Sequence, residues 1–404
     1  MSRSASPVDR KLMRAMNQNT LLNLIRLHAP ISRTQLMALS GLSSGTVVTI
    51  TAQLLEQELI VEQGVAESTI GRKAGLLELH PEGRYVIGLS LVEEETIAMV
   101  LLNLLGEVVA SESWTAPLRY QGAAAVQALA DGVTGFLSHS GIARDKVLGL
   151  GCGFSGYVAA QTGHIVDDWI HQWHDLAIGS LLSEKLQIPV YIDNIMNCLG
   201  SYERLFGPGK QYHDFLTVTL GRGIGLAMIV NGEIYRGARG GGGEFGHIPA
   251  IAGGRLCECG KRGCLEAYVS DQGLLASYHE LCQTHPNDPA VPVGLTLAQV
   301  QEQVQQGNAT LQQIFTHAGH LLGCGLATLV NLFNPECIIL TGPDVNSHQA
   351  IFASMHEALH QHTFSRLGEE LQLVIEPVAE TCWAQGAGCL VLRHFFRSPL
   401  GASL

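Results

Sequence analysis

The sequence has no apolar run long enough to cross a bilayer. Apolar residues account for 46% of its 404 residues, but none of their runs reaches the roughly 18 residues that a membrane-spanning helix requires. The amino-terminal stretch MSRSASPVDRK also lacks the apolar segment of a secretory signal. We therefore expect a cytoplasmic globular protein, and a chain of this length is expected to form two or three domains.

Basic residues are scarce, and their scarcity argues at first against nucleic-acid binding. The chain has 24 Lys and Arg against 36 Asp and Glu, a net charge of −12. Residues 1–83, however, carry a net charge of +1, so the remaining residues carry −13. This distribution permits DNA binding by the amino-terminal part alone, with weak nonspecific attraction.

Disulfide bonds are not expected either. Three of the ten cysteines lie close together between residues 257 and 264. The others are scattered, mostly in apolar surroundings, as is typical of reduced core residues in a cytoplasmic protein. These seven are Cys152, Cys198, Cys282, Cys324, Cys337, Cys382 and Cys389.

The stretch from Glu244 to Glu266, EFGHIPAIAGGRLCECGKRGCLE, concentrates metal-binding side chains. Its three thiols and one imidazole have the spacing of a tetrahedral Cys₃His zinc site. Four protein ligands leave no position for water, so we expect a structural Zn²⁺ that braces residues 244–266. The predicted ligands are His247, Cys257, Cys259 and Cys264.

Carboxylates bracket this predicted metal site. Glu244 precedes the histidine and Glu266 follows the last cysteine. A braced loop would hold both carboxylates at the edge of a pocket, where each can accept hydrogen bonds from the hydroxyls of a sugar.

The two motifs, ExGH and CxCGxxGCxE, resemble the signature of the ROK family of repressors and sugar kinases, and in particular its N-acetylglucosamine and xylose repressors. The resemblance implies that His247 and the three cysteines hold zinc. It also implies a sugar site made by Asn194, Glu244, His247 and Glu266. His247 can serve both sites because its two ring nitrogens face in different directions.

The amino-terminal part is predicted to be a flexible arm (1–16) followed by a winged helix-turn-helix domain (17–83). Three helices are expected from Asn17, with a capping box from Ser32 to Gln35 and a helix end at Gly41. Strands at 59–63 and 75–79 would form the wing. The alternative is a small helical domain for protein interaction.

The third helix of this domain, from about residue 43 to 57, is expected to lie in the major groove of operator DNA. Basic residues that are common on this helix in ROK repressors are absent here, so binding is expected to be weak or to depend on the linker that contains Gly71. The side chains expected to contact bases or phosphates are Arg33, Ser43, Ser44, Thr46, Thr49, Gln53, Arg72 and Lys73.

Residues 84–404 are predicted to form an α/β body. Strands are expected at 85–91, 96–104, 107–114, 147–154, 190–192, 215–220, 225–230, 337–340 and 371–376, with a helix at 122–139. The opening of three strands resembles the ribonuclease-H-like fold of the actin, hexokinase and sugar kinase superfamily. That resemblance implies two α/β lobes around a cleft.

The groups that a ROK kinase needs for phosphoryl transfer are missing from the expected positions. Residues 88–95, GLSLVEEE, replace the D-x-G-G-T phosphate hairpin. Ile195 occupies the position of the catalytic aspartate, although a shift of one residue would let Asp193 take its place. Arg222 and the stretch from Thr341 to Pro343 also depart from the nucleotide-binding pattern, so we expect no enzymatic activity.

The segment DDWIHQWHD, residues 167–175, allows two interpretations. His171 and His174 have a spacing at which they would share a helical face and bind a metal. The more ordinary interpretation is a surface loop at the pocket mouth with Trp169 and Trp173 half buried, where Trp173 or His174 shapes specificity. The glycine run 240–243 is interpreted as a hinge or tight loop.

These observations lead to the hypothesis of a repressor that binds operator DNA as a dimer or a dimer of dimers. A sugar or sugar phosphate would close the two lobes, change the spacing of the paired heads and lower operator affinity. Two alternatives remain at this point: a sugar kinase with an appended DNA-binding head, and a regulator whose effector is a protein.

Overall fold

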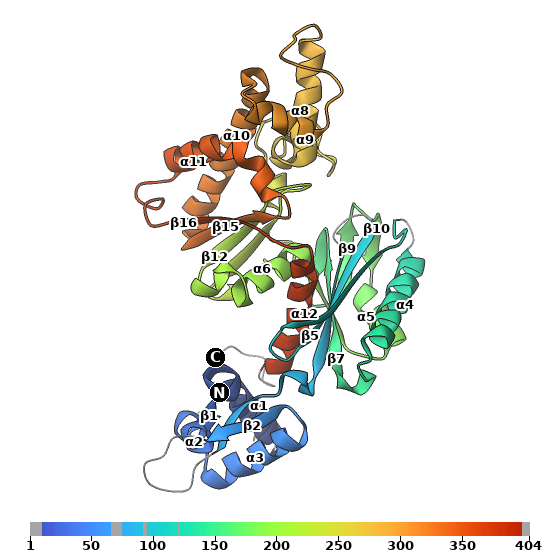
Figure 1. The fold of residues 1–404 in the computed structure, drawn as a ribbon, viewed down its shortest axis with the longest axis vertical. Coiled ribbons are helices and arrows are strands. Elements are labelled where there is room, and N and C mark those ends of the chain that lie inside the picture. The colour runs from blue at the N-terminus through green and yellow to red at the C-terminus, as the bar shows by residue number, and fades with distance from the viewer. Residues whose placement is uncertain (1–9, 66–74, 92–94, 120–121, 398–404) are drawn as a thin grey trace, which may run out of the picture.

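The computed structural model describes residues 10–65, 75–91, 95–119 and 122–397. Three parts follow one another along the long axis: an amino-terminal head, a first lobe and a second lobe (Figure 1). None of the described helices is by itself long and apolar enough to span a membrane; the bent pair α2 and α3 meets the length and composition limits only when taken together.

The head contains three helices and a small sheet. The helices are α1 (Arg10–His28), α2 (Arg33–Ser40) and α3 (Ser44–Glu56). The strands β1 (Ile31–Ser32), β2 (Ile60–Val65) and β3 (Gly75–Leu79) form an antiparallel sheet in the order β1-β3-β2. The predicted capping box joins Ser32 and Gln35, and α2 ends at Gly41 in the left-handed conformation.

Helix α1 corrects one prediction. It begins at Arg10, so residues 10–16 are helical and not part of a flexible arm; residues 1–9 lie outside the described part of the chain. The stretch from Lys11 to Met16 consists of good helix formers. The amide of Asn19 further stabilises this helix by donating to the carbonyls of Phe396 and Arg397 at the far end of the sequence.

The first lobe is a five-stranded sheet in the order β11-β7-β4-β5-β6. Strands β4 (Tyr85–Leu91), β5 (Thr96–Asn103) and β6 (Val108–Thr115) are antiparallel, whereas β7 (Val147–Phe154) and β11 (Val190–Asn194) run parallel to β4. Helices α4 (Gly122–Ser140) and α5 (Ile178–Leu186) pack on one face. Helix α12 (Thr381–Phe396) packs on the other face.

The second lobe repeats this topology, as predicted. Its sheet has the order β14-β13-β12-β15-β16. The antiparallel strands are β12 (Phe215–Thr219), β13 (Leu226–Val230) and β14 (Glu233–Ile234), and the parallel ones are β15 (Cys337–Gly342) and β16 (Gln372–Pro377). Runs of apolar residues made these strands predictable because both faces of the sheet are covered.

Helices cover both faces of this second sheet. One face carries α6 (Ile195–Leu205) and the first turn of α12. The other carries α10 (Ala309–Phe333) and α11 (Gln349–His362), with α7 (Glu266–Val269), α8 (Asp271–Thr284) and α9 (Leu297–Gln305) beyond them. Short 3₁₀ turns lie at 81–83, 144–146, 208–211, 245–247 and 345–348.

Helix α12 connects all three parts. Its first turn packs Cys382 and Trp383 against the second lobe. Its middle lies on the first sheet, so closely that a Cβ added at Gly88 of β4 would be 1.8 Å from the carbonyl oxygen of Ala384. Its end contributes Phe396 to the core of the head, and Figure 1 shows the helix running between these parts.

Candidate functional site: a cavity between the lobes beside a metal cluster

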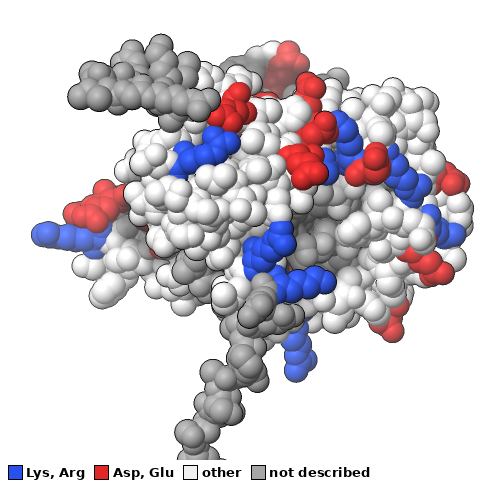
Figure 2. Space-filling model, turned by 90° about the horizontal axis from the view of Figure 1, so that it is seen from below, with Lys and Arg blue, Asp and Glu red and all other residues white. Residues whose placement is uncertain are grey.

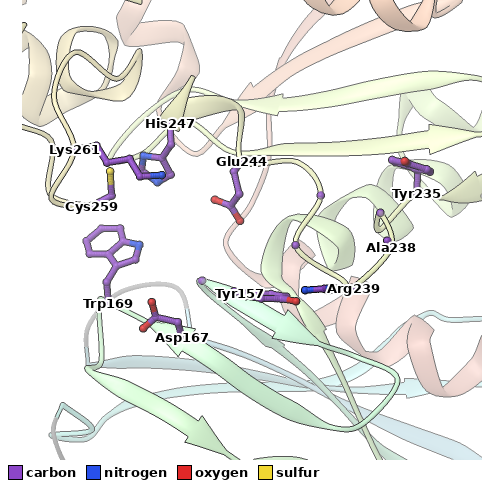
Figure 3. A pocket seen from close by; sticks show the side chains of 14 residues that line it. Tyr157, Asp167, Trp169, Tyr235, Ala238, Arg239, Glu244, His247, Cys259 and Lys261 are labelled. Carbon is purple, nitrogen blue, oxygen red and sulfur yellow. The ribbon is translucent and has the colours of Figure 1, made fainter. Parts of the chain in front are cut away.

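A cavity of about 670 Å³ lies between the two lobes. The first lobe contributes side chains from the three-stranded sheet of β8 (Tyr157–Ala159), β9 (His164–Asp168) and β10 (Trp173–Leu176) and from the turn between β9 and β10. The second lobe contributes the loops after β14. The labelled lining residues in Figure 3 are Tyr157, Asp167, Trp169, Tyr235, Ala238, Arg239, Glu244, His247, Cys259 and Lys261.

The four predicted metal ligands converge at one end of this cavity. Their donor atoms all lie within 4.8 Å of one another. His247 Nδ1 is 3.7 Å from Cys257 Sγ, and the sulfurs of Cys259 and Cys264 are also 3.7 Å apart. Two sulfurs bound to one tetrahedral zinc lie about 3.8 Å apart, given Zn–S bonds of about 2.3 Å. The four residues therefore fit a zinc ion.

The chemistry of these thiols also fits a cation. Burial raises the pKa of Cys257 to about 12, and the pKa of Cys264 is raised by burial together with the hydrogen bond that it shares with Cys259. Neighbouring thiols of this kind do not ionise together unless a positive charge compensates them.

The metal loop is held by turns and by one arginine that the sequence analysis did not single out. Gly263 has φ of +81°, and a Cβ there would lie 1.7 Å from the carbonyl oxygen of Ile251, so only glycine fits. The guanidinium of Arg255 donates to the carbonyls of Ala267 and Gly273 and lies 4.7 Å from the ring centroid of Tyr268. An arginine two residues before the first cysteine carries no sequence signal of this role.

The four predicted sugar-binding residues divide into two groups. Glu244 and His247 line the cavity, and Glu244 projects toward the first lobe in Figure 3. The carboxylate of Glu266 lies behind them, accepting from the backbone N–H of Ile224 at 2.9 Å. Asn194 caps α6, accepts from Met196 N–H and donates to the carbonyl of Gly156. It therefore supports the cavity wall.

The electrostatics of Glu244 distinguish it from an ordinary surface acid. Its side chain is open to the cavity, yet its pKa is raised, because the surrounding protein removes part of its water and the Glu266 carboxylate repels its charge. His247 opposes this shift. Together with Asp167 and Tyr157 on the opposite wall, Glu244 gives the cavity hydrogen-bonding groups on both sides.

A model of the ROK family matches residues 93–394. The chain belongs to the ROK family. The xylose repressor of Bacillus subtilis is 28% identical over 391 residues, covering 96% of this chain and 97% of the repressor. A glucokinase of Halalkalibacterium halodurans is 29% identical over 316 residues, covering 76% of this chain and 95% of the kinase.

Solved ROK structures share the fold of this chain. A crystal structure described as a ROK family transcriptional regulator, a homologue of the E. coli Mlc protein, superposes with a TM-score of 0.82 at 24% sequence identity. The superposition covers 95% of this chain and 97% of that one. The sugar-kinase-like fold of the body is thereby confirmed.

In ROK kinases the catalytic base was expected at the position of Ile195, or of Asp193 after a shift of one residue. Ile195 begins α6. Asp193 is 1% exposed and both of its oxygens are engaged. One accepts from the side-chain amide of Asn197 at 2.8 Å and the other from Nε of Arg236 at 2.8 Å.

The segment 167–175 agrees with the loop interpretation only in part. Its middle, residues 169–172, is a turn at the cavity, but its ends belong to the hairpin of β9 and β10, and no part of it is helical. His171 is buried and lies 2.7 Å from the buried carboxylate of Asp168, whereas His174 is exposed and pairs with Asp167. The two histidines therefore have separate partners and do not form a metal site with each other.

Of the two tryptophans expected to be half buried, only Trp169 is. Trp173 is 2% exposed, donates from Nε1 to the carbonyl of Leu118 and packs edge-on against Phe154. The prediction of a half-buried Trp173 near the sugar is therefore wrong, because β10 turns it into the core of the first lobe. Trp169, in the turn, lines the cavity instead.

The predicted DNA-contacting residues lie mainly along α3. Ser43 caps the helix, with Thr46 one turn on, and Ser44 and Thr49 are exposed. A groove between α1 and α3 is lined by Thr46 and Thr49 and also by Arg14, which the sequence analysis did not select.

The predicted basic contacts are less available. Arg33 makes a bidentate pair with Glu62 at 2.9 Å and donates to Thr51, so it is engaged within the head. Arg72 and Lys73 lie outside the described residues. Seen from the side of the head in Figure 2, blue and red side chains are scattered over a largely neutral surface.

Proposed function

We propose that this protein is a transcriptional repressor whose body binds a sugar or sugar phosphate without phosphorylating it. The named repressor from Bacillus aligns along 96% of the chain, head included, whereas the glucokinase leaves about a quarter of it unmatched. The inter-lobe cavity, with carboxylates on both walls, suits a polyhydroxylated ligand.

The observation that carries the proposal is the state of Asp193. A general base needs a carboxylate oxygen within reach of the attacking hydroxyl. Both oxygens of Asp193 are bound by protein donors, among them the side chains of Asn197 and Arg236. Ile195, at the expected position of the base, has no proton-accepting group. Glu244 and His247 nevertheless lie on the cavity wall. The chain therefore has groups to bind a sugar but no free base at either expected position to start phosphoryl transfer.

Zinc would be held by His247, Cys257, Cys259 and Cys264 and would act structurally, fixing the loop that carries Glu244 and Glu266 relative to each other. His247 Nδ1 faces the thiols, which leaves Nε2 for a ligand hydroxyl. The sugar contacts that we propose are Glu244 and His247 directly, with Glu266 and Asn194 positioning them.

The head would act as a winged helix-turn-helix. Helices α2 and α3 meet through a short turn at Gly41, and β2 and β3 form the wing. We propose that α3 reads the operator through Ser43, Ser44, Thr46, Thr49 and Gln53, with Arg72 and Lys73 reaching phosphate or the minor groove. A dimer would present two heads to a two-fold operator.

The test is a thermal-shift panel on the zinc-replete full chain with sugars, sugar phosphates and ATP. A ligand that binds only the folded state raises the unfolding midpoint. We expect a shift with one sugar or sugar phosphate and none with ATP, and the same compound should release operator DNA. A shift with ATP that a sugar enhances contradicts the proposal.

The similarity to a glucokinase favours one alternative, a kinase with an appended head. It predicts ATP-dependent turnover of a hexose and loss of that turnover in Asp193→Asn. An assay over a panel of hexoses decides between the two functions.

A further inference from the structure

A second group of metal-binding side chains lies away from the inter-lobe cavity, where helices α10 and α11 pack together. It consists of His320 and Cys324 on α10 and His362, the last residue of α11. Their donor atoms all lie within 4.8 Å of one another. Cys324 Sγ is 3.7 Å from His320 Nε2, and the two imidazole centroids are 5.9 Å apart.

The local sequence explains why two of these donors face the same way. His320 and Cys324 are four residues apart on one helix, so their side chains are neighbours on one face. A zinc ion with bonds of about 2.0 Å to nitrogen and about 2.3 Å to sulfur spans donors about 3.5 Å apart. The observed 3.7 Å therefore needs almost no adjustment.

The packing of α11 explains the third donor. A Cβ at Gly319 would lie 2.3 Å from the carbonyl oxygen of Ile351, and one at Gly323 would lie 2.3 Å from that of Met355. These two glycines let the helix backbones approach closely, so the end of α11 reaches the face of α10 that carries Cys324.

One asparagine then fixes the end of α11. The Asn331 amide on α10 donates to the carbonyl of His362 at 3.0 Å and accepts from the N–H of Phe364 at 2.7 Å. The backbone at the end of α11 is thus held against α10. A donor atom of the exposed His362 imidazole lies within 4.8 Å of those of the other two residues.

We propose that His320, Cys324 and His362 bind a second transition-metal ion, of the zinc and cobalt class, with a fourth position open to solvent. One thiolate and two imidazoles are donors that these ions prefer. His320 and His362 are exposed and Cys324 is half buried, so the ion exchanges with solution, unlike one held by the closed Cys₃His cluster. Binding ties the end of α11 to α10. The site is independent of the proposed repressor function.

The experiment is a Co²⁺ titration of the metal-depleted full chain, because thiolate-bound cobalt absorbs light strongly and each site can be counted. Wild type should bind two ions per chain and Cys324→Ser one. His362→Ala should lose tight binding of the second ion. The matched control is His360→Ala, an exposed histidine two residues away on the same helix, which should retain two ions.

The outcomes separate cleanly. A Cys324→Ser variant that binds as many ions as wild type overturns the proposal. Far-ultraviolet circular dichroism checks that each variant keeps its fold, so a lost ion reports the lost ligand. Failure here leaves the sugar response untouched, since that is measured with a different ligand.

Discussion

At the scale of single residues, Glu203 is a buried acid on α6 with one carboxylate oxygen that lacks a hydrogen-bond partner among the described residues. Burial, and then repulsion from Glu376, raises its pKa from 4.5 to about 7. The fold therefore favours the protonated form. The contribution of Glu203 to the free energy of unfolding is fully present below about pH 4.5 and is lost as the pH rises through about 7.

Glu203→Gln should remove the loss of stability that Glu203 causes as the pH rises. At 1.36 kcal/mol per pKa unit, the variant is expected to gain about 3 kcal/mol relative to wild type between pH 4 and pH 8. Thermal unfolding of both proteins across this range measures the gain. Glu280→Gln is the opposite control, because the hydrogen bond from Arg255 lowers the pKa of Glu280. Glu280→Gln should lose stability relative to wild type as the pH rises. If the stability of Glu203→Gln and of wild type changed in parallel with pH, the prediction would be refuted.

The metal cluster gives a second prediction at this scale. Cys257→Ser removes a thiolate that lies 3.7 Å from His247, so zinc content should fall and the sugar-dependent thermal shift should disappear with it. Elemental analysis and the thermal-shift assay measure the two effects. A zinc-free variant that still responds to the inducing sugar would show that the metal does not brace the site.

These ligands were predictable because they are close in sequence and their spacing alone defines a tetrahedral set. The residues on the opposite wall of the cavity were not predictable. Asp167 and Trp169 reach it only because β8, β9 and β10 fold into a separate small sheet, and no local pattern distinguishes the buried Trp173 from the exposed turn beside it.

At the scale of secondary-structure elements, the close packing of α12 against β4 depends on Gly88. A Cβ there would lie 1.8 Å from a backbone carbonyl of α12, which has no freedom to move aside. Gly88→Ala should therefore destabilise the body by about 1–3 kcal/mol. The control is Gly135→Ala in α4, where a Cβ meets nothing within 4 Å. It should stabilise by about 0.5–1 kcal/mol.

Thermal midpoints of the two variants test this contrast. A Gly88→Ala protein as stable as wild type would mean that α12 can shift along the sheet, which the close approach excludes.

Most strands of the two large sheets were predictable, for a physical reason. Buried parallel strands such as β7 and β15 are uninterrupted apolar runs, and their predicted and observed limits nearly coincide. Among the helices of the body only α4 was predicted with its bounds. The other body helices and the hairpin of β9 and β10 were not delimited, because their stability comes from packing on other elements.

At the scale of the whole molecule, the head and the body meet at the end of α12. The Asn23 amide donates to the carbonyl of Phe396 at 2.8 Å, and the guanidinium of Arg26 lies 4.9 Å from the Phe396 ring centroid. If ligand-driven movement of the lobes reaches the head through this contact, Asn23→Ala should leave operator binding intact. It should reduce the change in operator affinity on adding inducer by at least about fivefold.

Operator titrations with and without inducer measure this coupling. Gln18→Ala is the matched control, because Gln18 lies on the same helix and bonds only to Gln57 within the head in the described contacts. Equal inducer responses in Asn23→Ala and wild type would place the coupling elsewhere. The two lobes were predicted from the resemblance of the opening strands to the ribonuclease-H-like fold, but a contact between residues 23 and 396 has no local signature.

The length of α12 sets how far a tilt at one end of the helix displaces the other end. A helix of 16 residues is about 24 Å long at about 1.5 Å per residue, so a tilt of about 10° at its second-lobe end displaces the other end by about 4 Å. That displacement is close to the axial rise of one base pair, about 3.4 Å. In a dimer, a small closure of the lobes would thus shift each recognition helix along the operator by about one base-pair step. The heads themselves would not change.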